Sequence, residues 1–192
     1  MIAAFRELEH THAQMLGRLS KSMAQPGDVL RSLAAPGLRT SARNQLAGTV
    51  SEVRAGVVNA ELALALPGGS DRIHATLTMA SLRELGLQPG VAAVALIKAP
   101  SVFIAVDDGA SRSLPPVVLP SASLSISVRN ALRGTVSAVR AGAVNTEVQA
   151  RLAGGQTMVA MLSRDSAQRL ALRVGAPVRL LFQESSVILG VV

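Results

Sequence analysis

The chain has 192 residues, no cysteine, and a net charge of +7 from 17 arginines and two lysines against 12 acidic residues. The absence of cysteine excludes disulfide frameworks, thiolate zinc sites and cysteine nucleophiles. The positive excess fits DNA, RNA or a small anion as a partner, but three Phe and no Tyr or Trp disfavour base stacking on aromatic side chains.

Residues 1–24 are predicted to form an amphipathic helix. Apolar side chains such as Phe5, Leu8, Met15 and Leu19 recur three or four residues apart, which places them on one face. A helix with one apolar stripe needs a partner, so we expect it to pair with its copy in a second chain and to give a homodimer. Charged residues in this segment exclude a secretory signal, and no apolar run of about eighteen residues occurs anywhere. We therefore expect a soluble, cytoplasmic protein without membrane association.

An internal repeat follows a linker that Pro and Gly mark at residues 25–38. From Ser41 the chain reads SARN and then GTV, and 86 residues later it reads SVRN and then GTV again. VRAGVVNAEL likewise matches VRAGAVNTEV. A period of this length indicates two copies of one domain rather than a solenoid. We assign the first domain to residues 39–107 and the second to residues 123–192, separated by a Pro-rich linker at residues 108–122.

Each copy is predicted to be a small β domain. In the first copy, strands are expected at AGTVSEVRAG, VNAELALALPGG and RIHATLT, followed by a short helix at MASLRELG and two closing strands at VAAVALIKA and SVFIAV. Five strands and a helix are typical of an OB-like barrel. The predicted fold is therefore mainly β, with two tandem OB-like five-stranded barrels, each with a short helix, preceded by an N-terminal dimerisation helix.

The start of the short helix is a candidate anion site. Thr78 ends the third strand and suits the N-cap position, and Gly86 is placed to end the helix. Capping alone explains Thr78. A helix N-terminus also presents unpaired N–H groups and the positive end of a dipole, and Ser81 adds a second hydroxyl on the same turn.

Two cations extend this hypothesis. Lys98 stands at the end of an apolar strand, where a solvated strand-end lysine is the simpler interpretation, but a compact ammonium there also suits an oxyanion. Arg43 in SARN is the second candidate cation, and Ser41 beside it is another hydroxyl donor. Each of these signals alone is weak because serine and arginine are common.

Taken together in order, these motifs resemble a known family. TSARNQLAGTVSEVRAGVVNAEL, LTMASLRELGLQPG and ALIKAPSV are similar to the Mop domain, a TOBE-type molybdate-binding domain, and the resemblance spans residues 39–192. The tandem pair resembles the di-Mop region of ModE-type molybdate-responsive transcription regulators. The resemblance implies a molybdate oxyanion, with tungstate as an alternative ligand and no organic cofactor, bound at the interface of a homodimer. We find no helix-turn-helix before residue 25, so we expect DNA contact only through a winged-helix domain that this chain lacks.

The resemblance also implies which residues bind the anion. They are the residues of this chain that match the family motif, namely Ser41, Arg43, Thr78, Ser81, Lys98 and the backbone of Ala99. It implies that Ser41 and Arg43 come from one chain and that Thr78, Ser81 and Lys98 come from the other.

The second copy departs from the motif. Gln183 and Glu184 stand where the first copy has lysine and alanine, and a carboxylate there would repel a dianion, so we expect no equivalent site. Asn44 and Asn130 are shared by both copies, as are Gly48 and Gly134 and, later, Asn59 and Asn145, so we assign these residues a structural role.

Several functions are compatible with this pattern to different degrees. The leading hypothesis is the effector-sensing part of a molybdenum-responsive transcription regulator, and the alternative is a free-standing intracellular molybdate storage protein resembling molbindin. A TOBE extension of a transport ATPase is disfavoured because no Gly-rich phosphate loop precedes the repeats. An enzyme is disfavoured because no Ser/His/Asp set, carboxylate pair or metal cluster emerges from the repeated motifs.

Overall fold

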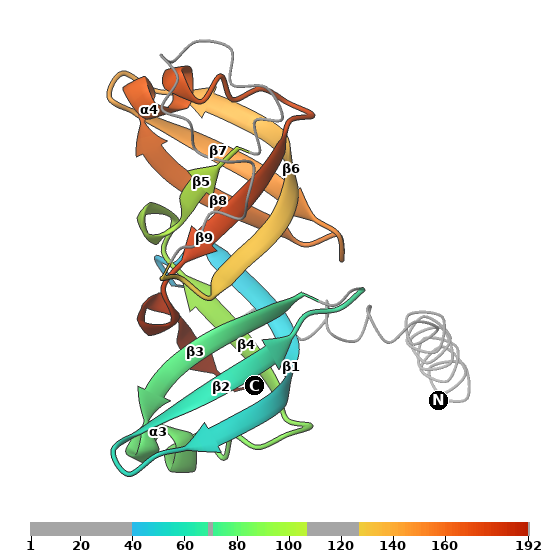
Figure 1. Ribbon diagram of the computed structural model, residues 1–192, viewed down its shortest axis with the longest axis vertical. Coiled ribbons are helices and arrows are strands. Elements are labelled where there is room, and N and C mark those ends of the chain that lie inside the picture. Colours follow the sequence, from blue (N-terminus) through green and yellow to red (C-terminus); the bar gives the residue numbers. More distant parts are fainter. Residues whose placement is uncertain (1–39, 69–70, 107–126, 192) are drawn as a thin grey trace, which may run out of the picture. The chain divides into compact units, whose positions relative to one another are not determined.

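The computed structural model describes residues 40–68, 71–106 and 127–191. The predicted N-terminal helix and both predicted linkers lie outside these residues. The described part is mainly β and forms two curled five-stranded sheets, so the predicted fold class is confirmed (Figure 1).

The two repeats contribute the same series of elements. The first repeat contains β1 (Asn44–Ala55), β2 (Asn59–Ala65), β3 (Arg72–Thr78), α3 (Met79–Glu84), β4 (Ala92–Ile97), η1 (Ala99–Ser101) and β5 (Phe103–Ala105). The second repeat contains β6 (Asn130–Ala141), β7 (Asn145–Leu152), β8 (Thr157–Ser163), α4 (Arg164–Arg169), β9 (Pro177–Phe182), η2 (Glu184–Ser186) and β10 (Ile188–Gly190). No helix in the described part of the chain has the length and apolarity that a membrane span requires.

The last strand of each repeat belongs to the sheet of the other repeat. The strand orders are β10-β4-β1-β2-β3 and β5-β9-β6-β7-β8, so β10 pairs with β4 while β5 pairs with β9. The sequence analysis expected each copy to supply all five of its own strands. The difference arises because the two repeats have similar sequences, so β4 and β9 offer equivalent edges and a short apolar strand does not reveal which edge it uses.

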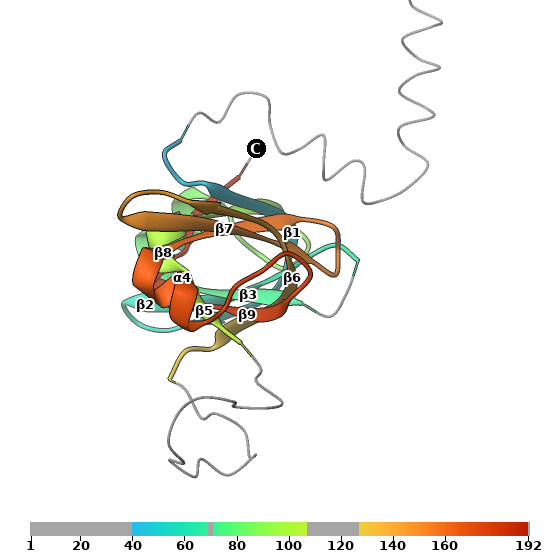
Figure 2. The same ribbon diagram turned by 90° about the horizontal axis from the view of Figure 1, so that it is seen from above.

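Each sheet is curled (Figure 2), and a cluster of buried apolar side chains fills the interior. The first strand of each repeat is long and bends at a bulge, between Val50 and Glu52 in β1 and between Val136 and Ala138 in β6, and such bulges increase local twist and bend the strand. Close packing also requires glycine at position 48, because an added Cβ at Gly48 would lie 2.5 Å from a backbone oxygen of the neighbouring strand. Its predicted structural role is confirmed.

Two asparagines connect each repeat to the edge strand of the other. Asn44 and Asn130 are both fully buried. Asn44 Nδ2 donates to the Val159 carbonyl at 2.9 Å, and its Oδ1 accepts from the Val159 N–H at 2.6 Å. Asn130 bonds in the same way to the carbonyl and N–H of His74, at 2.8 and 2.7 Å. The asparagines are therefore structural, as expected, but they bridge the repeats instead of closing turns.

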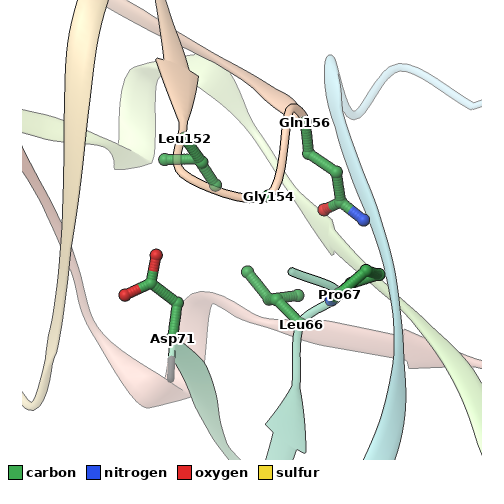
Figure 3. Close-up of a pocket in the computed structure, with 6 residues that line it drawn as sticks. All are labelled: Leu66, Pro67, Asp71, Leu152, Gly154 and Gln156. Atoms are coloured by element: carbon green, nitrogen blue, oxygen red, sulfur yellow. The ribbon is translucent and has the colours of Figure 1, made fainter. Parts of the chain in front are cut away.

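The loops between the second and third strands of each repeat also touch. An added Cβ at Gly154 would overlap the Pro67 carbonyl, so only glycine fits there. Gln156 Nε2 donates to the Ala47 carbonyl at 3.0 Å across the same junction. The small pocket that these loops enclose leaves essentially no space for a water molecule, so it is a packing contact rather than a ligand site (Figure 3).

Candidate functional site

The hydroxyl pair at the start of α3 has the predicted arrangement. Thr78 is the N-cap, and its Oγ1 accepts a hydrogen bond from the Ser81 N–H at 3.1 Å. The two hydroxyl oxygens lie 3.0 Å apart. Gly86, directly after the helix, has a φ of 58°, which confirms its role in ending the helix. Thr78 is exposed, so its hydroxyl is available to a ligand.

The cations lie together at the start of β1. The β1–β4 ladder ends with Asn44 opposite Ile97. Arg43 and Lys98 are the residues next to this last pair, one on each strand, so they lie side by side. Both are exposed, as is Ser41, whereas the side chain of Ala99 is buried.

Within one chain, the hydroxyls and the cations lie far apart. Thr78 pairs with Asn59, beyond the end of β1 at Ala55, whereas Arg43 precedes its first residue. The twelve residues of β1 separate the two groups by about 35 Å of strand. Figure 1 likewise has α3 at the end of the barrel away from the start of β1. The ladder therefore places Lys98 beside Arg43 and away from Thr78 within one chain, whereas the resemblance implied that Lys98 and Thr78 come from the same chain.

Arg43 forms an ion pair with the second repeat that the sequence analysis missed. Its Nη2 lies 3.1 Å from Glu147 Oε2, and Arg140 Nη1 lies 3.6 Å from the other oxygen of the same carboxylate. The Arg43 side chain nevertheless remains 56% exposed. The available signal was the glutamate shared by both repeats, Glu61 in VNAEL and Glu147 in VNTEV.

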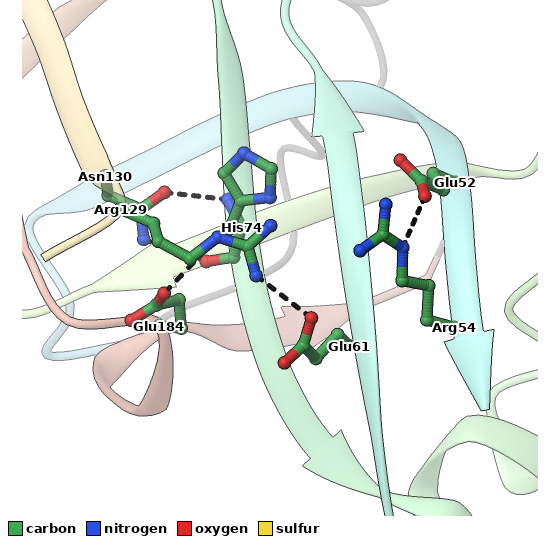
Figure 4. Close-up of polar contacts among 7 residues, drawn as sticks. All are labelled: Glu52, Arg54, Glu61, His74, Arg129, Asn130 and Glu184. Atoms are coloured by element: carbon green, nitrogen blue, oxygen red, sulfur yellow. Dashed lines mark hydrogen bonds and ion pairs between the residues drawn. The ribbon is translucent and has the colours of Figure 1, made fainter. Parts of the chain in front are cut away.

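The equivalent position in the second repeat is crowded with carboxylates (Figure 4). Arg129, which corresponds to Arg43, places Nη1 at 2.9 Å from Glu61 Oε2 and Nε at 3.8 Å from Glu184 Oε1. Glu184 begins η2, which packs against β3 of the first repeat. The Glu184 carboxylate therefore lies next to the Arg129 guanidinium. The corresponding residue of the first repeat, Ala99, has only a methyl group.

The charges around Arg129 are also neutralised more completely than those around Arg43. Arg54, the counterpart of Arg140, donates to Glu52 Oε1 at 2.7 Å, and this hydrogen bond lowers the pKa of the Glu52 carboxyl. The pKa of His74 is lowered by burial and then by the charge of Arg129, so His74 is neutral at pH 7. His74 contributes only its backbone N–H and carbonyl to the asparagine bridge.

The two equivalent positions therefore differ in charge. Around Arg43, the first position has three cations, with Lys98 and Arg140, against the single carboxylate of Glu147. Around Arg129, the second position has Arg54 and, acting through its charge on Glu52 and His74, Arg72, against the three carboxylates of Glu52, Glu61 and Glu184. The first arrangement carries an excess of positive charge and the second does not, so a dianion is favoured at the first, and the expected asymmetry between the repeats has a structural basis.

The hydroxyl end of the barrel carries exposed apolar residues. Val57 and Val58 form the tip of the β1–β2 hairpin and are 97% and 72% exposed. The Val58 carbonyl accepts a hydrogen bond from the Met79 N–H at 3.0 Å, which fixes this tip beside the start of α3. In the second repeat, Val144 is 73% exposed at the equivalent tip. Exposed apolar patches of this kind mark protein contacts.

No cluster of three or more His, Cys, Asp or Glu side chains suited to a metal cation occurs within residues 40–68, 71–106 and 127–191. The chemistry of the candidate site is instead that of an anion site, with guanidinium, ammonium, hydroxyl and backbone N–H donors.

Comparison with known proteins agrees with the repeat analysis. The TOBE domain family matches residues 40–104 and again residues 126–189. The chain is 38% identical over 190 residues to the molybdenum-pterin-binding protein MopA of Rhodobacter capsulatus, covering 99% of this chain and 66% of MopA. It is 32% identical over 191 residues to the molybdenum transport protein ModE of Herbaspirillum seropedicae, covering 100% of this chain and 66% of ModE. The chain thus spans about two thirds of the length of these relatives.

A solved structure is also similar. The cytoplasmic molybdate-binding protein ModG, crystallised with molybdate bound, superposes with a TM-score of 0.69 at 38% identity, covering 81% of this chain and all of the ModG chain. These relatives are named as binding and transport proteins, in line with the expectation of a binding module rather than an enzyme. The chain belongs to the TOBE domain family and carries two TOBE domains in tandem.

Proposed function

We propose that the protein binds molybdate at a site shared by two copies of the chain. One copy supplies Ser41, Arg43, Lys98 and the backbone of Ala99, and the other supplies the hydroxyls of Thr78 and Ser81. The observation that carries this proposal is the excess of cations around Arg43, which contrasts with the carboxylates around Arg129. The relatives MopA, ModE and ModG, named for molybdenum or molybdate, support an oxyanion as the ligand.

The separation of the two groups supports a homodimer. Because the cations and the hydroxyls lie at opposite ends of β1, one anion contacts both groups only if they come from different chains. The exposed Val57 and Val58 beside Thr78 provide apolar surface for that contact. A two-fold symmetric contact forms the site twice, so we expect one molybdate per chain. Anion binding and dimer geometry would then be thermodynamically linked.

Titration calorimetry tests this function directly. We expect molybdate to bind with one anion per chain, tungstate to bind in its place, and sulfate to bind far more weakly because it is smaller. At a concentration of about 100 times Kd, molybdate stabilises the folded state by about 2.7 kcal/mol, and Tm rises by about 5 to 10 °C. An equal shift with sulfate would contradict a site sized for molybdate. Mass measurement in solution gives the oligomeric state in the same samples.

The second repeat offers a gain-of-function test. Replacing Gln183 with lysine and Glu184 with alanine gives this position the residues that the first repeat has. Because Ser163 and Ser166 already have the arrangement of Thr78 and Ser81, we expect the double variant to bind a second molybdate per chain. The single change Gln183→Ala is the control and should leave the stoichiometry unchanged. Unaltered stoichiometry in the folded double variant would mean that charge does not set the asymmetry.

We place this binding in the effector-sensing part of a molybdenum-responsive transcription regulator in the cytoplasm, on the resemblance to ModE. The alternative is a free-standing molybdate storage protein, and the similarity to the cytoplasmic protein ModG supports this alternative. Deleting the gene distinguishes the two functions. Loss of a regulator abolishes the response of molybdate-uptake transcripts to added molybdate, whereas loss of a storage protein lowers the molybdenum content of cells and leaves that response intact.

A further inference from the structure

The hydroxyl pair of the second repeat lies beside arginines. The hydroxyl oxygens of Ser163 and Ser166 are 2.9 Å apart, and Arg169 Nη2 donates to the Ser166 oxygen at 3.1 Å. Arg164, the first residue of α4, provides a second exposed guanidinium. Because α4 contains a single carboxylate, that of Asp165, the helix is positive. The second repeat therefore has its own cations at the end of the barrel where the hydroxyls lie.

The first repeat lacks this charge at the corresponding end. Its helix α3 begins with Met79 where α4 begins with Arg164, and α3 is neutral because Arg83 is followed by Glu84. At the other end of the barrel the difference is reversed, since the first repeat has the excess of cations and the second repeat has the additional carboxylate of Glu184. The second repeat thus differs from the first by a cation at one end and a carboxylate at the other.

These opposite charges are too far apart to pair within one chain. Glu184 contacts Arg129, which directly precedes β6. Ser163, the N-cap of α4, pairs with Asn145, which lies beyond the end of β6 at Ala141. The twelve residues of β6 separate the two ends by about 35 Å of strand. The carboxylate and the α4 arginines therefore meet only between two copies of the chain.

The Glu184 carboxylate is available to such a partner. Its side chain remains 21% exposed. Among the residues that the structure describes, its one ion pair is with Arg129 Nε at 3.8 Å, which is longer than a charge-assisted hydrogen bond. Arg129 donates instead to Glu61, at 2.9 Å. The Glu184 carboxylate thus keeps the capacity to accept hydrogen bonds from a further guanidinium group.

We propose that Glu184 of one chain binds the guanidinium groups of Arg164 and Arg169 of a second chain, a contact that we call the carboxylate latch. Guanidinium binds carboxylate in a bidentate manner, which gives such a contact a defined geometry. The inference rests on the proposed function, because it uses the same arrangement of two chains in which the start of one barrel meets the helix end of another. A protein carboxylate then takes the place that molybdate has in the first repeat. The second repeats hold the dimer together without a ligand, and the first repeats respond to molybdate.

Sedimentation equilibrium of the full chain without molybdate measures the Kd of the dimer. Glu184→Gln and Arg164→Gln each remove one charge from the latch, which a two-fold symmetric dimer contains twice. We expect each change to raise the Kd by about ten-fold or more. The double variant should lose less than the product of the two single losses, because both changes break the same contact. Glu84→Gln and Arg173→Gln are the matched controls at exposed positions, and they should leave the Kd unchanged.

Molybdate binding distinguishes a failure of the latch from a failure of the proposed function. Glu184→Gln keeps every residue of the first site, so molybdate should bind to this variant and return its monomers to dimers. If Glu184→Gln and Arg164→Gln dimerise as well as the controls while molybdate still binds, the latch is wrong and the shared oxyanion site stands. Fully independent losses in the double variant would also overturn the latch. If the two variants dimerise poorly but the unaltered chain does not bind molybdate, the latch is supported and the proposed function is wrong.

Discussion

Replacing Lys98 with alanine is expected to weaken molybdate binding by about 10- to 100-fold. A hydrogen bond to a charged group contributes about 1.5 to 3 kcal/mol, and each 1.4 kcal/mol corresponds to a ten-fold change in Kd. Lys98 is exposed, so the fold should tolerate the change. Arg43→Ala should cause a similar loss and also leaves the Glu147 carboxylate, only 19% exposed, beside the anion. Calorimetry with molybdate gives both affinities.

Because the proposed site is shared by two chains, a more specific test of it is possible with mixed dimers. In an equal mixture of Lys98→Ala and Thr78→Ala chains, mixed dimers contain one site with both defects and one intact site. We expect such mixtures, after exchange of subunits, to recover part of the high-affinity binding that neither variant has alone. If the chains form mixed dimers but high-affinity binding is not recovered, the site is not built from two chains. If Lys98→Ala and Arg43→Ala both bind molybdate with unchanged affinity, the assignment of these residues to the site is wrong.

Replacing Asn44 with alanine is expected to cause the largest loss of stability. The change leaves both the N–H and the carbonyl of Val159 without their partner at a buried position. Each unsatisfied buried group costs about 1 to 3 kcal/mol, so the free energy of unfolding should fall by about 2 to 6 kcal/mol. Asn130→Ala should cost less, because its partner His74 is only partly buried. Denaturant unfolding of both variants measures the difference.

The exposed neighbour Gln45 supplies the control, and Gln45→Ala should change the free energy of unfolding by less than about 0.5 kcal/mol. A second control is Asn44→Asp, whose carboxyl, when protonated, still offers an acceptor for the Val159 N–H and an O–H donor for the Val159 carbonyl. It should be more stable than the alanine variant at a pH where the carboxyl is protonated, and it should lose stability when the carboxyl ionises, because an ionised carboxylate has no donor. An Asn44→Ala variant as stable as the Gln45→Ala variant would show that the bridge between the repeats contributes nothing to stability.

The sequence predicted local features better than distant ones. Thr78 and Gly86 were identifiable as the ends of α3 because capping depends on residues a few positions apart. Arg43 and Lys98 were identifiable as cations near strand ends. The partner of Arg43 was not, since Glu147 lies 104 residues away and its choice depends on how the two repeats pack. The same holds for Asn44, whose shared position in both repeats indicated a structural role but not the strand that it binds.

The division of the site between chains shows a related limit. The family resemblance grouped Lys98 with Thr78 and Ser81, but the register of β4 against β1 brings Lys98 next to Arg43. Register depends on pairing between strands, which the residue types alone do not specify here.

The exchange of β5 and β10 between the sheets also has a consequence for how the chain folds. Neither sheet gains its fifth strand until the other repeat has formed, so until then β4 and β9 each keep an open edge. Contacts between residues far apart in sequence slow folding, and open edges invite pairing with other chains. The asparagine bridges span 115 and 56 residues and form only when the repeats meet. The pair of repeats is therefore the smallest part of this protein in which both sheets are complete, and the interval before they join is when the chain is most exposed to aggregation.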